Sequence, residues 1–204
     1  AGYRTGEIAY AAAQSHLAYY RILERRGAAR LLCSGADVAD HFATWESATD
    51  FDELPIGMVI GMEGADSILW PEMVHEWWDD GLRVISLSHY GKSVYCHGTG
   101  TGTDGGLFPP ARQLLAEMDK AGMMLDLTHA SDASVREALE LFSGRILASH
   151  QNCRALAPGE RQFPDDQLQA IIDRDGIVGH SMDSWMVYPG GWDDWGDIPT
   201  RPEV

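Results

Sequence analysis

The chain has 204 residues, 45% of them hydrophobic and 23% charged, which is typical of a folded globular protein and excludes wholesale disorder. Its 31 acidic and 15 basic side chains give a net charge of −16, the opposite of the balance found in proteins that bind nucleic acid. No segment approaches the run of about 20 apolar residues that a membrane span requires.

Two further features of the sequence bear on location. Residues 1–10 lack the basic and then apolar profile of a signal peptide. The three cysteines (Cys33, Cys96 and Cys153) are too scattered for a disulfide framework or a CxxC site. They fit a reducing compartment, so we expect a cytoplasmic location.

Helix-like and strand-like segments alternate along the chain. Apolar spacing and terminal residues predict helices over residues 7–26, 71–80, 110–121, 131–142 and 164–175. Short apolar runs typical of buried strands occupy residues 29–32, 55–62, 84–87, 123–127, 145–148 and 177–179. Glycines follow four of the helices, at Gly27, Gly81, Gly122 and Gly176, where a C-terminal cap is common.

This alternation predicts the fold class. The connections are short and the strands are apolar on both faces, which indicates a parallel sheet with crossover helices and therefore an α/β protein. We expect one domain over residues 1–204.

Polar side chains stand directly after five consecutive apolar runs. They are Glu63, His89, His129, His150 and His180. The carboxyl ends of parallel strands form the active-site face of barrels and of other parallel α/β folds, and packing does not explain a Glu or His at each of five such ends.

One carboxylate with several neutral imidazoles is a ligand set for a divalent metal, with zinc the first expectation. The acidic net charge does not oppose the binding of a cation. In a hydrolase, zinc lowers the pKa of its bound water toward about 7 and polarises a carbonyl group.

Two other motifs compete with this interpretation. Gly100, Gly102 and Gly105 formally match a dinucleotide fingerprint, but no strand leads directly into them, so a mobile loop at the active site is favoured. The segment 192–195, Trp-Asp-Asp-Trp, has the residue types of a ligand-binding cluster, although ordinary loop hydrophobes are favoured there.

Several blocks of the sequence resemble the membrane (renal) dipeptidase family, a group of zinc peptidases with a TIM-barrel-like metallo-hydrolase fold. The similarity extends from about residue 7 to 188, and the block Asp-Leu-Thr-His-Ala-Ser at 126–131 is the most diagnostic. His129 and His150 lie 21 residues apart, and Arg161 follows His150 by 11. The matching blocks are Gly-Met-Glu-Gly at 61–64, Leu-Ser-His at 87–89, residues 114–131, Ser-His at 149–150 and Arg-Gln-Phe-Pro-Asp-Asp at 161–166.

The resemblance implies a role for each matching site residue. Glu63 resembles the carboxylate that bridges two zinc ions, and His129 and His150 resemble the remaining protein ligands of one zinc. His89 resembles the histidine that contacts substrate and stabilises the tetrahedral intermediate. Arg161, which the pattern alone predicts to be a surface residue, resembles the arginine that binds the substrate carboxylate. A hydroxide bridging the two metals would attack the peptide carbonyl.

The sequence also departs from the family pattern. It has neither the His-x-Asp pair of the first strand, which holds the other zinc, nor the late aspartate that shuttles a proton to the leaving amine. A full barrel takes about 250 residues, so we expect a fragment that supplies roughly strands three to seven of eight and lacks part of the site.

The predicted function is therefore that of a zinc metallo-dipeptidase. It would act on dipeptides or similar small molecules, with two zinc ions in the complete protein. The sequence does not decide whether the protein forms a homodimer. Two other functions also remain as alternatives: another metal-dependent amide or ester hydrolase on the same scaffold, and a non-catalytic binding protein that retains zinc.

Overall fold

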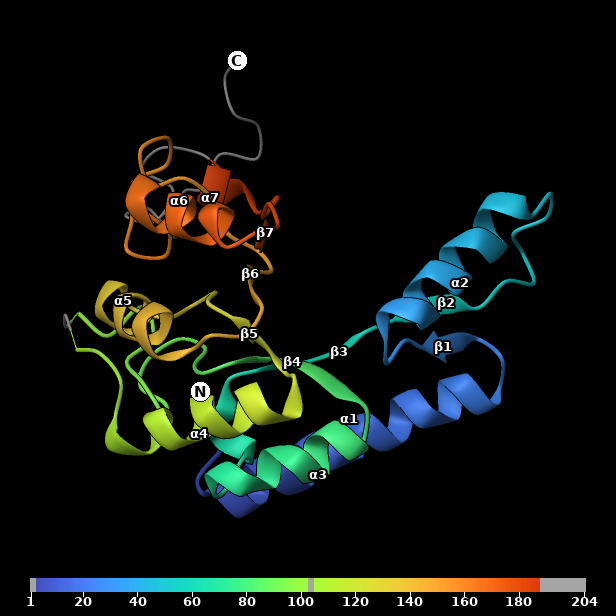
Figure 1. The fold of residues 1–204 in the computed structure, drawn as a ribbon, viewed down its shortest axis with the longest axis horizontal. Coiled ribbons are helices and arrows are strands. Elements are labelled where there is room, and N and C mark those ends of the chain that lie inside the picture. The colour runs from blue at the N-terminus through green and yellow to red at the C-terminus, as the bar shows by residue number, and fades with distance from the viewer. Residues whose placement is uncertain (1–2, 103–104, 188–204) are drawn as a thin grey trace.

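The computed structural model describes residues 3–102 and 105–187, in which helices alternate with parallel strands (Figure 1). The tryptophan-rich segment 192–195 lies outside the described residues. The strands are β1 (Ala29–Leu31), β2 (Ile56–Met58), β3 (Ile60–Glu63), β4 (Leu82–Ser86), β5 (Met124–Asp126), β6 (Ile146–Ala148) and β7 (Ile177–Val178). The helices are α1 (Gly6–Arg25), α2 (Gly35–Ser47), η1 (Ala65–Ser67), η2 (Pro71–Met73), α3 (Val74–Asp79), α4 (Pro109–Ala121), α5 (Asp132–Leu141), α6 (Asp165–Asp173) and α7 (Ser184–Val187).

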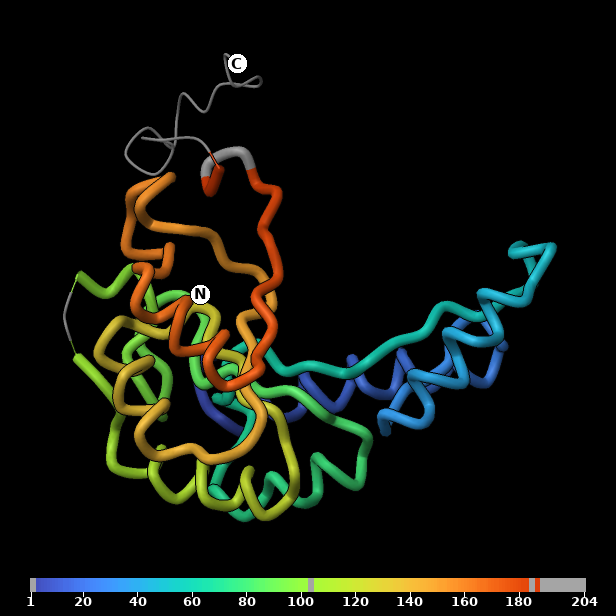
Figure 2. The backbone as a smooth tube through the Cα atoms, turned by 45° about the horizontal axis from the view of Figure 1, so that its top comes forward, coloured from blue at the N-terminus to red at the C-terminus, as the bar shows by residue number. Residues whose placement is uncertain are grey.

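Strands β3 to β7 form one sheet in sequence order, and every neighbouring pair is parallel. Glu63 pairs with Ser86, Ser86 with Asp126, and Asp126 with Leu147, so the carboxyl ends of β3 to β6 lie at one edge. This arrangement confirms the predicted parallel α/β architecture. Strands β1 and β2 form a separate parallel pair, which extends with α2 beyond the larger sheet (Figure 2).

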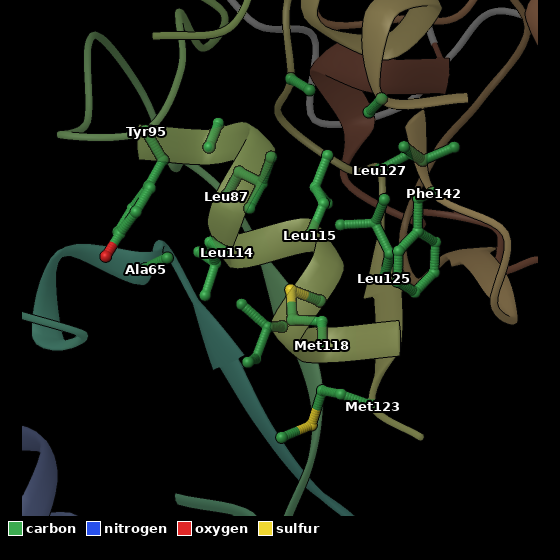
Figure 3. Packing of buried hydrophobic residues seen from close by; sticks show 14 of the residues in the cluster. Ala65, Leu87, Tyr95, Leu114, Leu115, Met118, Met123, Leu125, Leu127 and Phe142 are labelled. Atoms are coloured by element: carbon green, nitrogen blue, oxygen red, sulfur yellow. The ribbon is translucent and has the colours of Figure 1, made fainter. Parts of the chain in front are cut away.

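The core lies between the five-stranded sheet and its crossover helices. Helix α4 turns Leu114, Leu115 and Met118 inward, where they are fully buried near Leu125 of β5 and Phe142 (Figure 3). Because interiors are close-packed, this layer fixes α4 against the sheet.

The ends of the helices follow the local signals of the sequence. Gly27 and Gly122 adopt left-handed conformations, with φ of 72° and 78°, as expected for glycines that follow a helix. At α5, the Ser131 hydroxyl accepts a hydrogen bond from the Ser134 amide at 3.2 Å. Helix α6 ends at Asp173, before the predicted limit, and Asp175 takes the left-handed position with φ of 56°.

One expectation about the strands is wrong. The run 55–62 is not a single buried strand, because β2 pairs with β1 whereas β3 pairs with β4. The chain passes from one sheet to the other at Val59, which is 46% exposed, and Ile56 is 65% exposed. A continuous apolar run does not reveal that its two halves have different partners.

The helix prediction also needs two corrections. Helix α2 lies outside the predicted helices; its only buried residue is His41, and Ser34 caps it by accepting a hydrogen bond from the Asp37 amide at 3.1 Å. The predicted helix 71–80 divides into the 3₁₀ turn η2, which begins at Pro71, and the short α3.

The segment between β6 and α6, residues 149–164, carries two of the predicted site residues and is tied to α5. The Arg154 guanidinium donates two hydrogen bonds to the Asp132 carboxylate, at 2.7 and 2.8 Å. Its charge lowers the pKa of the Asp132 carboxyl below the ordinary value, mainly through these bonds. The pair therefore stabilises the connection that follows His150.

We expect Asp132→Asn to lower the free energy of unfolding at pH 7 by about 1 kcal/mol, because this partly exposed pair is screened by solvent. A carboxyl with a depressed folded-state pKa stabilises fully above its unfolded pKa, near 3.9, and the effect disappears as pH falls through the folded value. Urea unfolding from pH 7 downward should show a difference that narrows below about pH 4. If the difference in the free energy of unfolding stayed constant with pH, it would contradict the ion pair. Asp173→Asn is the control, because the Asp173 carboxylate accepts a hydrogen bond from the neutral Gln169 amide.

Candidate metal centre

Four polar side chains meet where strands β3 to β6 end. Glu63 is the last residue of β3, and His89, His129 and His150 follow the ends of β4, β5 and β6 by two or three residues. Since the strands are parallel and in register, these residues lie at one edge of the sheet although they are far apart in sequence.

The closest contacts in the cluster form a small triangle of potential ligand atoms. Glu63 Oε1 lies 3.0 Å from His129 Nε2 and 3.2 Å from His150 Nε2. The two Nε2 atoms are themselves 3.2 Å apart. The other carboxylate oxygen, Oε2, faces His89 Nε2 at 4.0 Å. The two carboxylate oxygens of Glu63 thus face different imidazole rings.

These separations fit a bound metal ion. In a tetrahedral site with zinc–ligand bonds of about 2.0–2.1 Å, neighbouring ligand atoms lie about 3.3 Å apart. The triangle of Glu63, His129 and His150 has sides close to that value. His89 is also near enough to take part, because Glu63, His89 and His129 offer ligand atoms that all lie within 4.8 Å of one another.

The protonation states of Glu63 and His129 also favour the binding of a cation. Burial lowers the pKa of His129 to about 4, so this imidazole, 2% exposed, is neutral at pH 7. Hydrogen bonds from His129 and then His150 lower the pKa of the half-exposed Glu63 carboxyl, which is therefore ionised. A neutral imidazole and an ionised carboxylate are the forms that bind metal.

The two close histidines are held differently. The Ser149 hydroxyl lies 2.8 Å from His150 Nδ1, so a hydrogen bond on the far side of the ring helps to orient it. His129 Nδ1 is buried and has no hydrogen-bond partner among the residues that the structure describes. The orientation of the His129 ring therefore depends on its backbone, on the groups around Nε2 and on the rings that pack against it.

The expectation that Arg161 is a surface residue is wrong. Its side chain is only 1% exposed, and Nη2 donates a hydrogen bond to the His150 carbonyl oxygen at 2.9 Å. Nη1 donates to Gln151 Oε1, and Nη2 also lies 3.4 Å from His129 Nε2. Polar neighbours in sequence concealed this burial, which arises from contacts with the end of β6. The same burial lowers the pKa of the guanidinium.

Tyr90 is a site residue that sequence reasoning missed. The centroid of its ring lies 4.7 Å from that of His89 and 4.7 Å from that of His129, and both contacts are edge to face. Partial burial raises the pKa of the phenol, which also interacts with Arg161. The one sequence signal that points to Tyr90 is its position directly after the predicted site residue His89.

His180 does not join this cluster. It is exposed and lines a separate, mainly apolar hollow of about 480 Å³ together with Leu156, Ile172 and Met186. The convergence expected of five strand ends therefore occurs at four of them. A second hollow, of about 560 Å³, lies in front of the cluster and is bordered by Glu63, His89 and Tyr90.

The glycine-rich stretch lies beside the cluster. Gly98 forms a β-bridge with Ala130, and the Thr99 amide donates a hydrogen bond to the His129 carbonyl oxygen at 2.7 Å. Strand β4 ends at Ser86, so no strand leads directly into these glycines and the arrangement of a dinucleotide-binding turn is absent from the described segment 87–102.

Comparison with known proteins places the chain in a family. The family model described as "Membrane dipeptidase (Peptidase family M19)" matches residues 11–186. An uncharacterized dipeptidase of Schizosaccharomyces pombe is 30% identical over 132 residues, which are 63% of this chain and 32% of that protein. Dipeptidase aclJ of Aspergillus oryzae is 32% identical over 130 residues, which are 62% of this chain and 31% of that protein.

Solved structures agree with this result. A metallo peptidase from Rhodobacter sphaeroides, whose structure holds a phosphinate mimic of the dipeptide L-Ala-D-Ala, superposes with a TM-score of 0.79 at 26% identity. The match covers 92% of this chain and 53% of that one. An amidohydrolase from Pseudomonas aeruginosa, 21% identical with a TM-score of 0.76, shares the fold over 86% of this chain and 52% of its own.

The chain thus spans about a third of the length of these curated relatives and about half of the solved structures. None of the described helices combines the length and the apolar character needed to cross a membrane. The shared architecture confirms the TIM-barrel-like fold, of which the described strands form a part. With the family model covering residues 11–186, the chain belongs to the membrane dipeptidase family of metallopeptidases, peptidase family M19.

Proposed function

We propose that this chain forms part of a zinc-dependent dipeptidase that hydrolyses the peptide bond of dipeptides. The triangle of Glu63 Oε1, His129 Nε2 and His150 Nε2, with sides of 3.0 to 3.2 Å, is the observation that carries this proposal. Membership of the family and the metallopeptidase structures with the same fold support it.

The proposed roles divide the cluster between metal and substrate. Glu63, His129 and His150 would hold one zinc ion, and the second oxygen of Glu63, which faces His89, is free to serve a second ion in the complete protein. When bound, zinc would supply an activated water and polarise the peptide carbonyl. Glu63 and His129 contribute by presenting an ionised carboxylate and a neutral imidazole at pH 7.

His89 and Arg161 would act on the substrate. His89 is exposed, borders the hollow of about 560 Å³ and can donate a hydrogen bond to an oxygen that gains negative charge during hydrolysis. Arg161 supplies a buried positive charge beside His129 and His150, and its planar fork suits the carboxylate of a dipeptide. The hollow has the volume of a small-molecule site.

The proposed substrate class comes from a structural relative. The Rhodobacter sphaeroides metallo peptidase holds a phosphinate mimic of L-Ala-D-Ala. We therefore propose dipeptides with a free carboxylate as substrates of the complete protein. A panel of dipeptides, amides and esters separates this activity from that of another hydrolase on the same scaffold.

We expect the folded 204-residue chain to retain about one zinc ion after dialysis, because three ligand atoms already stand at tetrahedral spacing. His129→Ala and His150→Ala should each lose most of this zinc, measured by metal analysis with near-ultraviolet circular dichroism as the test of folding. His75→Ala is the control, since the partly buried His75 pairs with Glu117 and has no place in the cluster. A folded double variant that keeps its zinc would exclude this site, and zinc retention without hydrolysis in the complete protein would favour the binding-protein alternative.

Arg161→Lys should raise KM for a dipeptide about 10-fold and leave kcat nearly unchanged, because lysine keeps the charge but not the two-pronged geometry. Steady-state kinetics on a dipeptide and on its C-terminal amide test this role. The amide lacks the carboxylate and should be affected much less. An equal loss on both compounds would show that Arg161 supports His150 through its carbonyl oxygen instead of binding substrate.

A further inference from the structure

A buried carboxylate connects the two strands that carry the closest histidines. Asp126 is the last residue of β5 and is 8% exposed. Its Oδ1 accepts a hydrogen bond from the Thr128 amide at 3.0 Å and another from the Ser149 amide at 3.0 Å. One oxygen atom thus joins the segment that follows β5 to the segment that follows β6.

The two amide donors stand directly before the two histidines. Thr128 precedes His129, and Ser149 precedes His150. The last ladder bond between these strands runs from the Leu127 amide to the Leu147 carbonyl oxygen at 2.9 Å. The Asp126 carboxylate therefore continues the connection at the point where the strands diverge, and carboxylates are the strongest acceptors available for such amides.

The histidines need such support. Their Nε2 atoms lie 3.2 Å apart, and His129 has a left-handed backbone with φ of 68°, a conformation that is unfavourable for residues other than glycine. The His129 Nδ1 atom has no partner among the described residues. The backbone, which Asp126 anchors on both sides, therefore contributes to the short separation of the two rings.

We propose that Asp126 is a positioning residue that sets the separation of His129 and His150 by bonding the amide that precedes each of them. The inference rests on the proposed metal site, because it gives these two hydrogen bonds a role beyond pairing the Thr128 and Ser149 amides. The hydrogen bonds of Asp126 go to backbone amides and not to the histidine rings, so it acts through other residues and is not a catalytic residue.

Asp126 could position the two histidines through the length of its side chain, here called its reach, or through its negative charge. The side chain has the length that places one oxygen between the two amides. Its negative charge also acts on the nearby Arg161 guanidinium. Asp126→Asn keeps the length and the acceptor oxygen but removes the charge, whereas Asp126→Glu keeps the charge and changes the length. The two variants therefore separate the explanations.

The test is the zinc affinity of each folded variant, measured by competition with a chromophoric chelator. Positioning by reach predicts that Asp126→Asn stays within about 3-fold of the wild type and that Asp126→Glu binds zinc about 10-fold more weakly or worse. Asp119→Glu is the matched control, because Asp119 Oδ2 accepts from the Ser143 amide at 3.1 Å on a connection without site residues. If Asp126→Glu does not fold, Asp126→Ala takes its place with the same criterion.

A second readout needs no metal. The imidazole NMR signals of His129 and His150, assigned with the alanine variants, should move in metal-free Asp126→Glu and remain near their wild-type positions in Asp126→Asn. Wild-type zinc affinity and unmoved signals in a folded Asp126→Glu or Asp126→Ala variant would overturn the inference, as would a 10-fold loss in Asp126→Asn. A wild-type chain that binds no zinc would instead contradict the proposed metal site, and the NMR signals would then decide the role of Asp126.

Discussion

The parallel register of strands β3 to β6 is the constraint on which the rest of the structure depends. Because Glu63, Ser86, Asp126 and Leu147 align across the sheet, the segments after the four strands begin at the same edge. Residues up to 87 positions apart in sequence then place their polar atoms within a few ångströms. A shift of one residue in any pairing would turn a strand's side chains to the opposite face and separate these atoms.

The hydrogen bonds within this cluster cannot satisfy all of its acceptor atoms. Two imidazole nitrogens and a carboxylate oxygen lie about 3 Å apart, and burial keeps His129 neutral at pH 7. A neutral imidazole can donate only one proton, so hydrogen bonds within the cluster cannot satisfy every lone pair that points inward. A divalent cation would accept all three pairs of electrons at once, which explains why such an arrangement suits metal binding better than a purely structural role.

The sequence predicts local elements well and tertiary partners poorly. Helix α4 carries a buried stripe, a proline at its start and Gly122 at its end, so its limits could be predicted to within a residue. The run 55–62 could not be assigned correctly, since its halves join different sheets. Local polarity identified Glu63, His129 and His150 because each directly follows an apolar run. It failed for Arg161, whose burial comes from contact with the end of β6, and it could not show that His180 stands apart.

The backbones of the two closest histidines are hydrogen-bonded to the loops around the cluster. The His129 carbonyl oxygen accepts hydrogen bonds from the Thr99 amide at 2.7 Å and the Ser88 hydroxyl at 3.4 Å, and the His150 carbonyl oxygen accepts one from Arg161. The segment 88–99, part of which borders the hollow of about 560 Å³, thus also holds the backbone of His129. If the proposed metal site is correct, changes in the segment 88–99 should therefore alter metal affinity together with the shape of this hollow, whereas in a site built only on strand ends the two properties could vary separately.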